Sequence, residues 1–134
     1  MLFRSLTNGS KYTFAVAGLN ALGTGEASPA TAETVPYGKP TAVTSARVTG
    51  VVKAKYLVIG VRGATSNGSP ITEYRVKWAF GASKKFTTWK TIKANGVFNI
   101  LGWPKGSTVK FQVASVNARG VTISKLFTLS TPKK

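Results

Sequence analysis

Several kinds of functional residue are missing from this sequence of 134 residues. It contains no cysteine and no histidine, and its three acidic residues are all glutamate. Without cysteine the chain can form neither a disulfide framework nor a thiolate metal site. General acid–base catalysis most often uses histidine or a carboxylate, and metal sites need cysteine, histidine or clustered carboxylates. We therefore predict that the protein is not an enzyme and holds no cofactor or metal.

Long apolar runs are also missing. No stretch approaches the ~20 apolar residues that a membrane-spanning helix needs. The N-terminal segment is not a signal peptide, because its apolar part is short and Asn8-Gly9 interrupts it. What the chain does contain is a hydrophobic fraction of 43%, with three Trp, four Tyr and seven Phe. This composition indicates a folded globular protein rather than a disordered one.

Positive charge is abundant and unevenly placed. Nineteen Lys and Arg residues give a net charge of +16. Residues 1–36 are neutral overall, since Arg4 and Lys11 balance Glu26 and Glu33. The whole excess therefore belongs to residues 37–134. This asymmetry favours an anionic partner, and the alternative is a solvated basic surface with no particular partner.

An internal repeat organises the chain. Residues 6–23 and residues 103–120 share eight of 18 positions at an offset of 97 residues. Both copies have the form of a turn, a strand with alternating apolar residues and a second turn. Chance would give about one match, since a common residue accounts for roughly 7% of average composition. A repeat of this kind indicates two related structural units.

The alternation of apolar residues predicts short strands throughout. In the second unit Leu57, Ile59 and Val61 share one face, as do Tyr74, Val76 and Trp78. We expect Gly50 to end the first strand of this unit. The seven strands expected there are Val43–Val48, Lys55–Val61, Ile71–Phe80, Phe86–Ile92, Val97–Leu101, Thr108–Val116 and Ile123–Thr131.

In the first unit, residues 1–36, the sequence predicts only two strands. Tyr12, Phe14 and Val16 alternate with polar or small residues in the first, and a weaker strand runs to Val35. Because an isolated hairpin is marginal in water, we expect this unit to be part of a longer protein whose chain begins upstream. Residues 35–40 are the expected linker, short enough to keep the two units close but able to reorient.

The motifs resemble the fibronectin type III family, in its bacterial form. Residues 65–76 (TSNGSPITEYRV) look like the loop and third strand of such a domain. Residues 6–14 and 20–25 resemble its sixth strand and the loop that follows. The resemblance implies an all-β, immunoglobulin-like β-sandwich of seven antiparallel strands in residues 37–134, preceded by a β-hairpin from a truncated second module in residues 1–36.

The second unit departs from the family at a corner before its sixth strand. The family has a tyrosine there whose hydroxyl holds the corner, and Tyr12 occupies that place in the first unit. Val109 occupies it in the second, and Trp103 replaces the leucine that Leu6 provides in the first. We therefore expect the second unit to lack this hydrogen bond and to fill the corner with apolar bulk.

Basic residues interleaved with aromatic ones are the candidate site. Such a surface suits an anionic polymer, since charge attracts it and rings stack on bases or sugars. The alternative places the aromatic residues in the core. This interpretation is favoured for Trp78, whereas for Trp89 both a core and a surface position are open. A salt bridge is the expected role of Glu73. The residues expected to bind are Arg75, Lys77, Lys84, Lys85, Trp89, Lys90, Lys93, Lys110 and Lys125.

The resemblance implies a non-catalytic spacer or adhesion module of a bacterial secreted or cell-surface protein, connected to other domains of a longer parent. Its localisation would then be extracellular or at the cell surface. A second hypothesis is a basic module that binds an anionic polymer, such as teichoic acid or acidic polysaccharide, with nucleic acid less favoured. A third is a structural module of a phage or filament protein.

Overall fold

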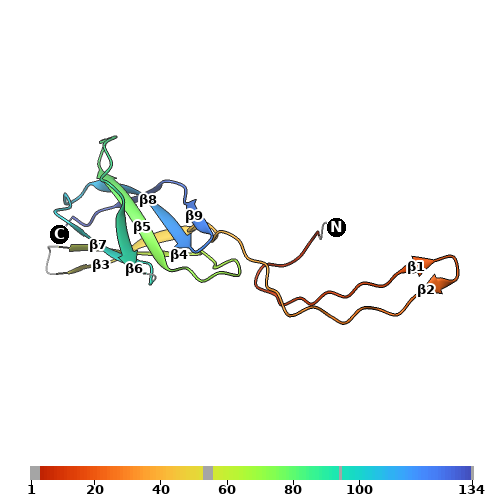
Figure 1. Ribbon diagram of the computed structural model, residues 1–134. Coiled ribbons are helices and arrows are strands. Elements are labelled where there is room, and N and C mark those ends of the chain that lie inside the picture. Colours follow the sequence, from red (N-terminus) through yellow and green to blue (C-terminus); the bar gives the residue numbers. More distant parts are fainter. Residues whose placement is uncertain (1–3, 53–55, 94, 134) are drawn as a thin grey trace.

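The computed structural model describes residues 4–52, 56–93 and 95–133, and in these ranges all regular secondary structure is strand (Figure 1). The strands are β1 (Leu19–Asn20), β2 (Gly23–Thr24), β3 (Ser45–Val52), β4 (Tyr56–Arg62), β5 (Glu73–Phe80), β6 (Lys90–Lys93), β7 (Val97–Leu101), β8 (Thr108–Asn117), β9 (Gly120–Ile123) and β10 (Phe127–Ser130).

Two antiparallel sheets form a sandwich from β3 to β10. One sheet has the order β3-β4-β7. The other has the order β10-β8-β5-β6, and β9 also pairs with β8. The all-β immunoglobulin-like prediction is thus confirmed, with the seventh expected strand divided into β9 and β10.

The central strand of the second sheet is β8, and its sequence explains its position. Val109, Phe111 and Val113 alternate along it and are fully buried. The Phe111 ring lies edge-on to Phe98 of β7, with centroids 5.7 Å apart, and 5.5 Å from Phe127 of β10. One alternating strand therefore joins the two layers of the core.

The predicted faces of the other strands are also confirmed. Leu57, Ile59 and Val61 of β4 are buried, as the period-two pattern requires. On β5, Tyr74 and Val76 are buried in the same core. Trp78 is partly buried against that core, as the favoured interpretation expected.

Two predicted strand limits in the sandwich are wrong. Gly50 does not end its strand, because β3 continues to Val52 through an irregularity in register between Val48 and Gly50. This is the effect of a β-bulge, which bends a strand without ending it. The fourth strand is only β6, since the Thr87 hydroxyl accepts a hydrogen bond from the Trp78 amide where a carbonyl would continue the ladder.

Residues 4–36 extend away from the sandwich as a long hairpin with β1 and β2 at its tip (Figure 1). Two full strands were predicted here, and this is wrong in detail. Outside β1 and β2 the described part of the hairpin has one isolated bridge, between Tyr12 and Thr34. Hydroxyl groups of Ser28 and Thr31 accept hydrogen bonds that carbonyls would accept in a regular ladder.

Candidate functional surface

The outer face of the five-stranded sheet carries part of the predicted basic site. In the β5–β8 register Arg75 lies opposite Ala114, Lys77 opposite Gln112, and Lys110 opposite Ala79. Cross-strand partners point to the same side of a sheet. Arg75, Lys77 and Lys110 therefore share the face that is turned away from the core.

Two aromatic rings gather around Lys77 on this face. Its Nζ lies 5.0 Å from the centroid of the Trp89 ring and 5.5 Å from that of Phe86. These distances are typical of cation–π contacts. Trp89 is 38% exposed, so of the two positions left open for it, core or surface, the structure shows the surface. The arrangement offers a flat ring beside a positive charge.

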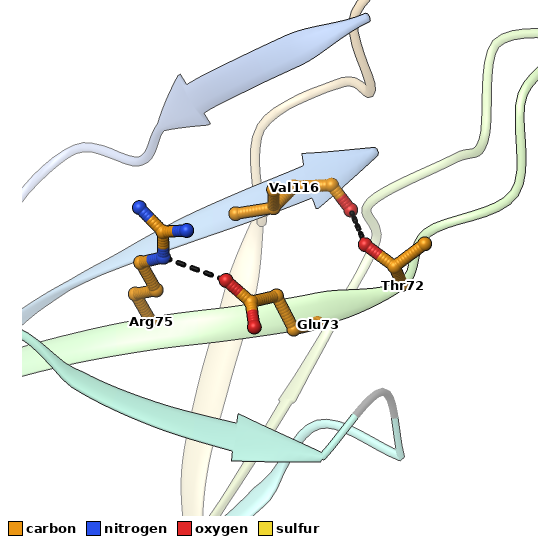
Figure 2. Close-up of polar contacts among 4 residues, drawn as sticks. All are labelled: Thr72, Glu73, Arg75 and Val116. Atoms are coloured by element: carbon orange, nitrogen blue, oxygen red, sulfur yellow. Dashed lines mark hydrogen bonds and ion pairs between the residues drawn. The ribbon is translucent and has the colours of Figure 1, made fainter. Parts of the chain in front are cut away.

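The charge of Arg75 is compensated locally. Its Nε donates to Glu73 Oε1 at 2.7 Å, which confirms the salt bridge expected for Glu73 (Figure 2). Next to this pair the Thr72 hydroxyl donates to the Val116 carbonyl at 3.3 Å. Lys93 lies opposite Glu73 in the β5–β6 register, and so it lies on the same side of the sheet as Glu73. An incoming anion would compete with Glu73 for Arg75.

The remaining predicted residues are only partly brought together. Lys110 Nζ donates to the Ser83 carbonyl at 3.1 Å, which ties the loop carrying exposed Lys84 and Lys85 to the sheet. Lys90 pairs with Val76 and so belongs to the core side of the sheet, where it lines a groove with Trp78. Lys125 is exposed between β9 and β10, across β8 from the two rings.

The three-stranded sheet has a hollow that sequence reasoning missed. It has a volume of about 350 Å³ and lies over Gly60, where β4 has no side chain. Arg47 and Arg62 line it together with Thr49 and Asn95, and no acidic residue does. The sequence feature that could have predicted this hollow is Gly60 inside an apolar strand, since a strand glycine often marks a site where a ligand or another backbone approaches closely.

The described ranges show neither a metal-binding cluster nor a membrane-spanning helix. No group of three or more His, Cys, Asp or Glu side chains lies together there. Within the same ranges no helix is long and apolar enough to cross a membrane. Of the three glutamates, Glu33 pairs with Lys11 at 2.7 Å and Glu73 with Arg75.

No family model matches the sequence, but the fold matches solved structures. The chicken CNTN1 FN1-FN3 domains align over 94% of this chain with 18% identity and a TM-score of 0.65. The sixth fibronectin type III domain of human fibronectin type III domain containing protein 3 aligns over 73%, with 18% identity and a TM-score of 0.50. The sandwich has the fibronectin type III fold.

A third structure, the twitchin kinase region from C. elegans, aligns over 70% of this chain with 12% identity and a TM-score of 0.56. The chain spans 45% of the CNTN1 fragment, 17% of the twitchin fragment and 85% of the human domain. At these identities the comparisons show the fold.

The corner before the repeated strand is built differently in the hairpin and in the sandwich. In the hairpin the Thr7 amide donates to the Tyr12 hydroxyl at 2.9 Å, and this hydrogen bond lowers the pKa of Tyr12. The repeat places Pro104 where Thr7 stands, and proline has no N–H to donate. Val109, at the place of Tyr12, therefore loses nothing by lacking a hydroxyl.

Thr131 holds the second corner instead. Its hydroxyl donates to the Pro104 carbonyl at 2.6 Å and accepts from the Ser107 amide at 2.8 Å. Trp103 is 7% exposed in the same corner, as expected for apolar bulk there. A threonine that follows β10 thus holds this corner, where the hairpin uses Tyr12.

Proposed function

We propose that the chain is a non-catalytic spacer or adhesion module of a bacterial secreted or cell-surface protein, in which residues 4–36 supply the last two strands of a second fibronectin type III unit. One observation carries this proposal. The hairpin reproduces, in detail, the last hairpin of the complete sandwich, and so the chain consists of two related units joined end to end.

The turns of the two hairpins agree. Asn20 pairs with Gly23 and Asn117 with Gly120. The two glycines have φ angles of 132° and 137°, which few other residues adopt. Each asparagine Oδ1 accepts a hydrogen bond from the amide two residues later, at 2.9 Å for Asn20 and 2.8 Å for Asn117.

The interruptions of the final strand agree as well. The Val113 amide donates to the Ser124 hydroxyl at 3.0 Å, and the Ser124 amide donates to the Val113 carbonyl at 2.8 Å. In the hairpin the Val16 amide donates to the Ser28 hydroxyl at 3.1 Å, and the Ser28 amide donates to the Val16 carbonyl at 2.8 Å. The same local structure has formed twice.

The surroundings of the two hairpins differ. Val113 is fully buried, whereas its counterpart Val16 is 65% exposed, and Leu19 is 78% exposed. In the sandwich, β4, β5 and β7 supply the residues that cover the equivalent face. The hairpin therefore has the apolar face of a sandwich strand pair, which further strands of the same fold would cover.

A chimera tests this assignment. Residues 40–102 are fused to the N-terminal side of Leu6, so that the repeat register supplies five strands to the hairpin. We expect the Val16 amide to become protected from exchange and a second unfolding transition to appear. The original sandwich in the same chain is the internal control. Continued exposure of Val16 would show that the hairpin does not complete such a unit.

A second candidate function is the binding of an anionic polymer, such as teichoic acid or acidic polysaccharide. The contact of Lys77 with Trp89 and Phe86 favours it, together with Lys93 and Lys110 on the same face. Such binding weakens steeply as salt rises, because bound counterions are released. Rings beside cations add stacking that depends little on salt.

Two variants of equal net charge separate the candidates. Lys77→Ala/Lys93→Ala changes the proposed face, and Lys105→Ala/Lys133→Ala removes the same charge elsewhere. If the face binds polymer, the first pair elutes from a sulfated-polysaccharide column at clearly lower salt than the second. Equal elution of both pairs supports the spacer role and contradicts a dedicated site.

A further inference from the structure

The linker between the two units is held by hydrogen bonds along its length. Sequence composition predicted a short segment able to reorient. In the structure, the Gly38 amide donates to the Asn67 carbonyl at 3.0 Å and the Thr41 amide to the Thr65 carbonyl at 3.0 Å. Pro40 between them is buried. These contacts join the linker to the loop between β4 and β5.

We propose that the β4–β5 loop and the β8–β9 turn form a docking surface for the corner of a preceding fibronectin-like unit, so that residues 36–40 act as a fixed joint. This inference rests on the proposed role as a spacer, and it adds that the spacer sets an orientation as well as a distance. Three sets of contacts carry it.

The first set comes from Asn117. This side chain is 5% exposed, and its Nδ2 lies 2.9 Å from the Gly38 carbonyl, 3.1 Å from that of Ser66 and 3.0 Å from that of Ser69. Its Oδ1 accepts from the Arg119 amide. An amide has two N–H donors, so Asn117 shares them among three carbonyls. One side chain therefore connects turn, loop and linker.

The second set comes from Asn67. Its Nδ2 donates to the Lys39 carbonyl at 2.9 Å, and its Oδ1 accepts from Asn8 Nδ2 at 2.9 Å. Asn8 belongs to the corner of the hairpin unit, while Asn67 belongs to the sandwich. This bond is a direct contact between the two units, and it does not pass through the linker.

The third set is a close backbone approach. A Cβ on Gly68 would lie 2.7 Å from the Gly9 nitrogen and 2.8 Å from the Pro36 carbonyl oxygen. The Gly9 amide donates to that same Pro36 carbonyl at 2.8 Å. With a φ of +84°, Gly68 also has a backbone conformation that favours glycine. The surface thus accepts a corner only because residue 68 lacks a side chain.

Side chains cover the joint from outside. The Arg119 guanidinium carbon lies 3.7 Å from the centroid of the Tyr37 ring, a close cation–π contact. The aliphatic part of Lys39 lies against Gly120, at 3.0 to 3.3 Å from where a Cβ would be. Both contacts join the β8–β9 turn to the linker, and both would be lost if the linker moved freely.

The opposite end of the sandwich has the form that this surface accepts. The Gly106 amide donates to the Pro132 carbonyl at 2.9 Å, as Gly9 donates to Pro36. Gly106 also has a positive φ, 63° against 86° for Gly9. Lys105 stands in the place of Asn8 and can still donate to an acceptor like the Asn67 oxygen. The two ends are therefore complementary, and they suit modules joined head to tail.

Amide exchange in the full chain tests the joint, with Asn117→Ala as the variant and Asn99→Ala, on the exposed face of β7, as the matched control. In the wild type and in the control we expect slow exchange at Gly38 and a proton–proton Overhauser effect between Gly9 and Gly68. In Asn117→Ala we expect exchange at Gly38 to become at least tenfold faster. Val113 reports in each sample whether the sandwich is intact.

Two results would overturn the proposal. One is a Gly38 amide that exchanges in the wild type as fast as in an unstructured peptide. The other is a Gly38 exchange rate that Asn117→Ala leaves unchanged while Val113 stays protected. Should Asn117→Ala unfold, Asn67→Ala is the second variant, since among the residues that the structure describes the Asn67 side chain bonds only to Asn8 and Lys39. We then expect the Gly9–Gly68 effect to vanish. Its persistence would show that the Asn67 side chain does not hold the joint, and its absence from the wild type would contradict a fixed joint. A flexible joint would leave the spacer role standing, because the chimera and the column measure that role independently.

Discussion

The threonine that replaces the corner tyrosine gives the sharpest test of how this sandwich is held together. Thr131 is 4% exposed and its hydroxyl makes two hydrogen bonds, to the Pro104 carbonyl and from the Ser107 amide. Thr131→Val keeps the shape of the side chain and removes both bonds. The change therefore isolates the hydroxyl from any effect of packing volume.

Each hydrogen bond contributes a net ~1 kcal/mol to stability. Pro104 is exposed and Ser107 partly so, which lets water satisfy some of what is lost. We therefore expect Thr131→Val to lower the free energy of unfolding by about 2 kcal/mol, against the 5–15 kcal/mol typical of a domain. For a unit of this size the melting temperature should fall by roughly 10 °C.

Urea unfolding followed by tryptophan fluorescence measures this loss, because Trp103 is buried in the same corner. The slope against urea should stay unchanged, since the surface exposed on unfolding is the same. Thr128→Val on the exposed side of β10 is the matched control, and Thr131→Ser keeps the hydroxyl. A Thr131→Val variant as stable as the Thr128→Val control would refute the idea that threonine has replaced the tyrosine.

Three further outcomes are expected. Phe111→Ala should cost about 3–5 kcal/mol in urea unfolding, because the ring is fully buried between two others, and a loss under 1 kcal/mol would contradict its central place. Ser124→Ala should cost about 1–3 kcal/mol by leaving the Val113 amide unsatisfied, and a neutral result would show that the hydroxyl is dispensable. In absorbance titration at alkaline pH Tyr12 should ionise before Tyr74, since the Thr7 hydrogen bond lowers the pKa of Tyr12 and burial raises that of Tyr74. The stability that neutral Tyr74 contributes is complete below pH ~10 and is lost as the pH rises through its raised pKa. Single Tyr→Phe variants assign each titration step to its tyrosine, and ionisation of Tyr74 before Tyr12 would contradict the causes given for both shifts.

Much of the sandwich could be predicted because its strands bury one face. Leu57, Ile59 and Val61 alternate with residues on the other face of β4, and a one-residue slip would turn all three outward. The strand limits were less predictable. Gly50 lies within a bulged strand, and Ser124 divides the last strand through a side-chain hydrogen bond that composition does not reveal.

The candidate surface could be predicted only in part. Strand parity correctly put Arg75 and Lys77 on one face, since alternation is a local property. Lys90 was misplaced because it was grouped with Lys93, although alternation along β6 puts Lys90 on the core side with Ile92 and Lys93 on the outer side. The contact of Trp89 with Lys77 depends on how that loop folds back over β5, which is a matter of packing.

The sequence by itself determined the architecture of the sandwich and showed the internal repeat. The 97-residue repeat and the period-two alternation are local patterns, and burial of one face leaves them few alternatives. Only the tertiary structure decided how the units are joined, because Asn8, Asn67 and Asn117 are far apart in the chain and meet at the joint. It likewise decided that Thr131 replaces the corner tyrosine, since the partners of a single hydroxyl depend on where the folded backbone brings them.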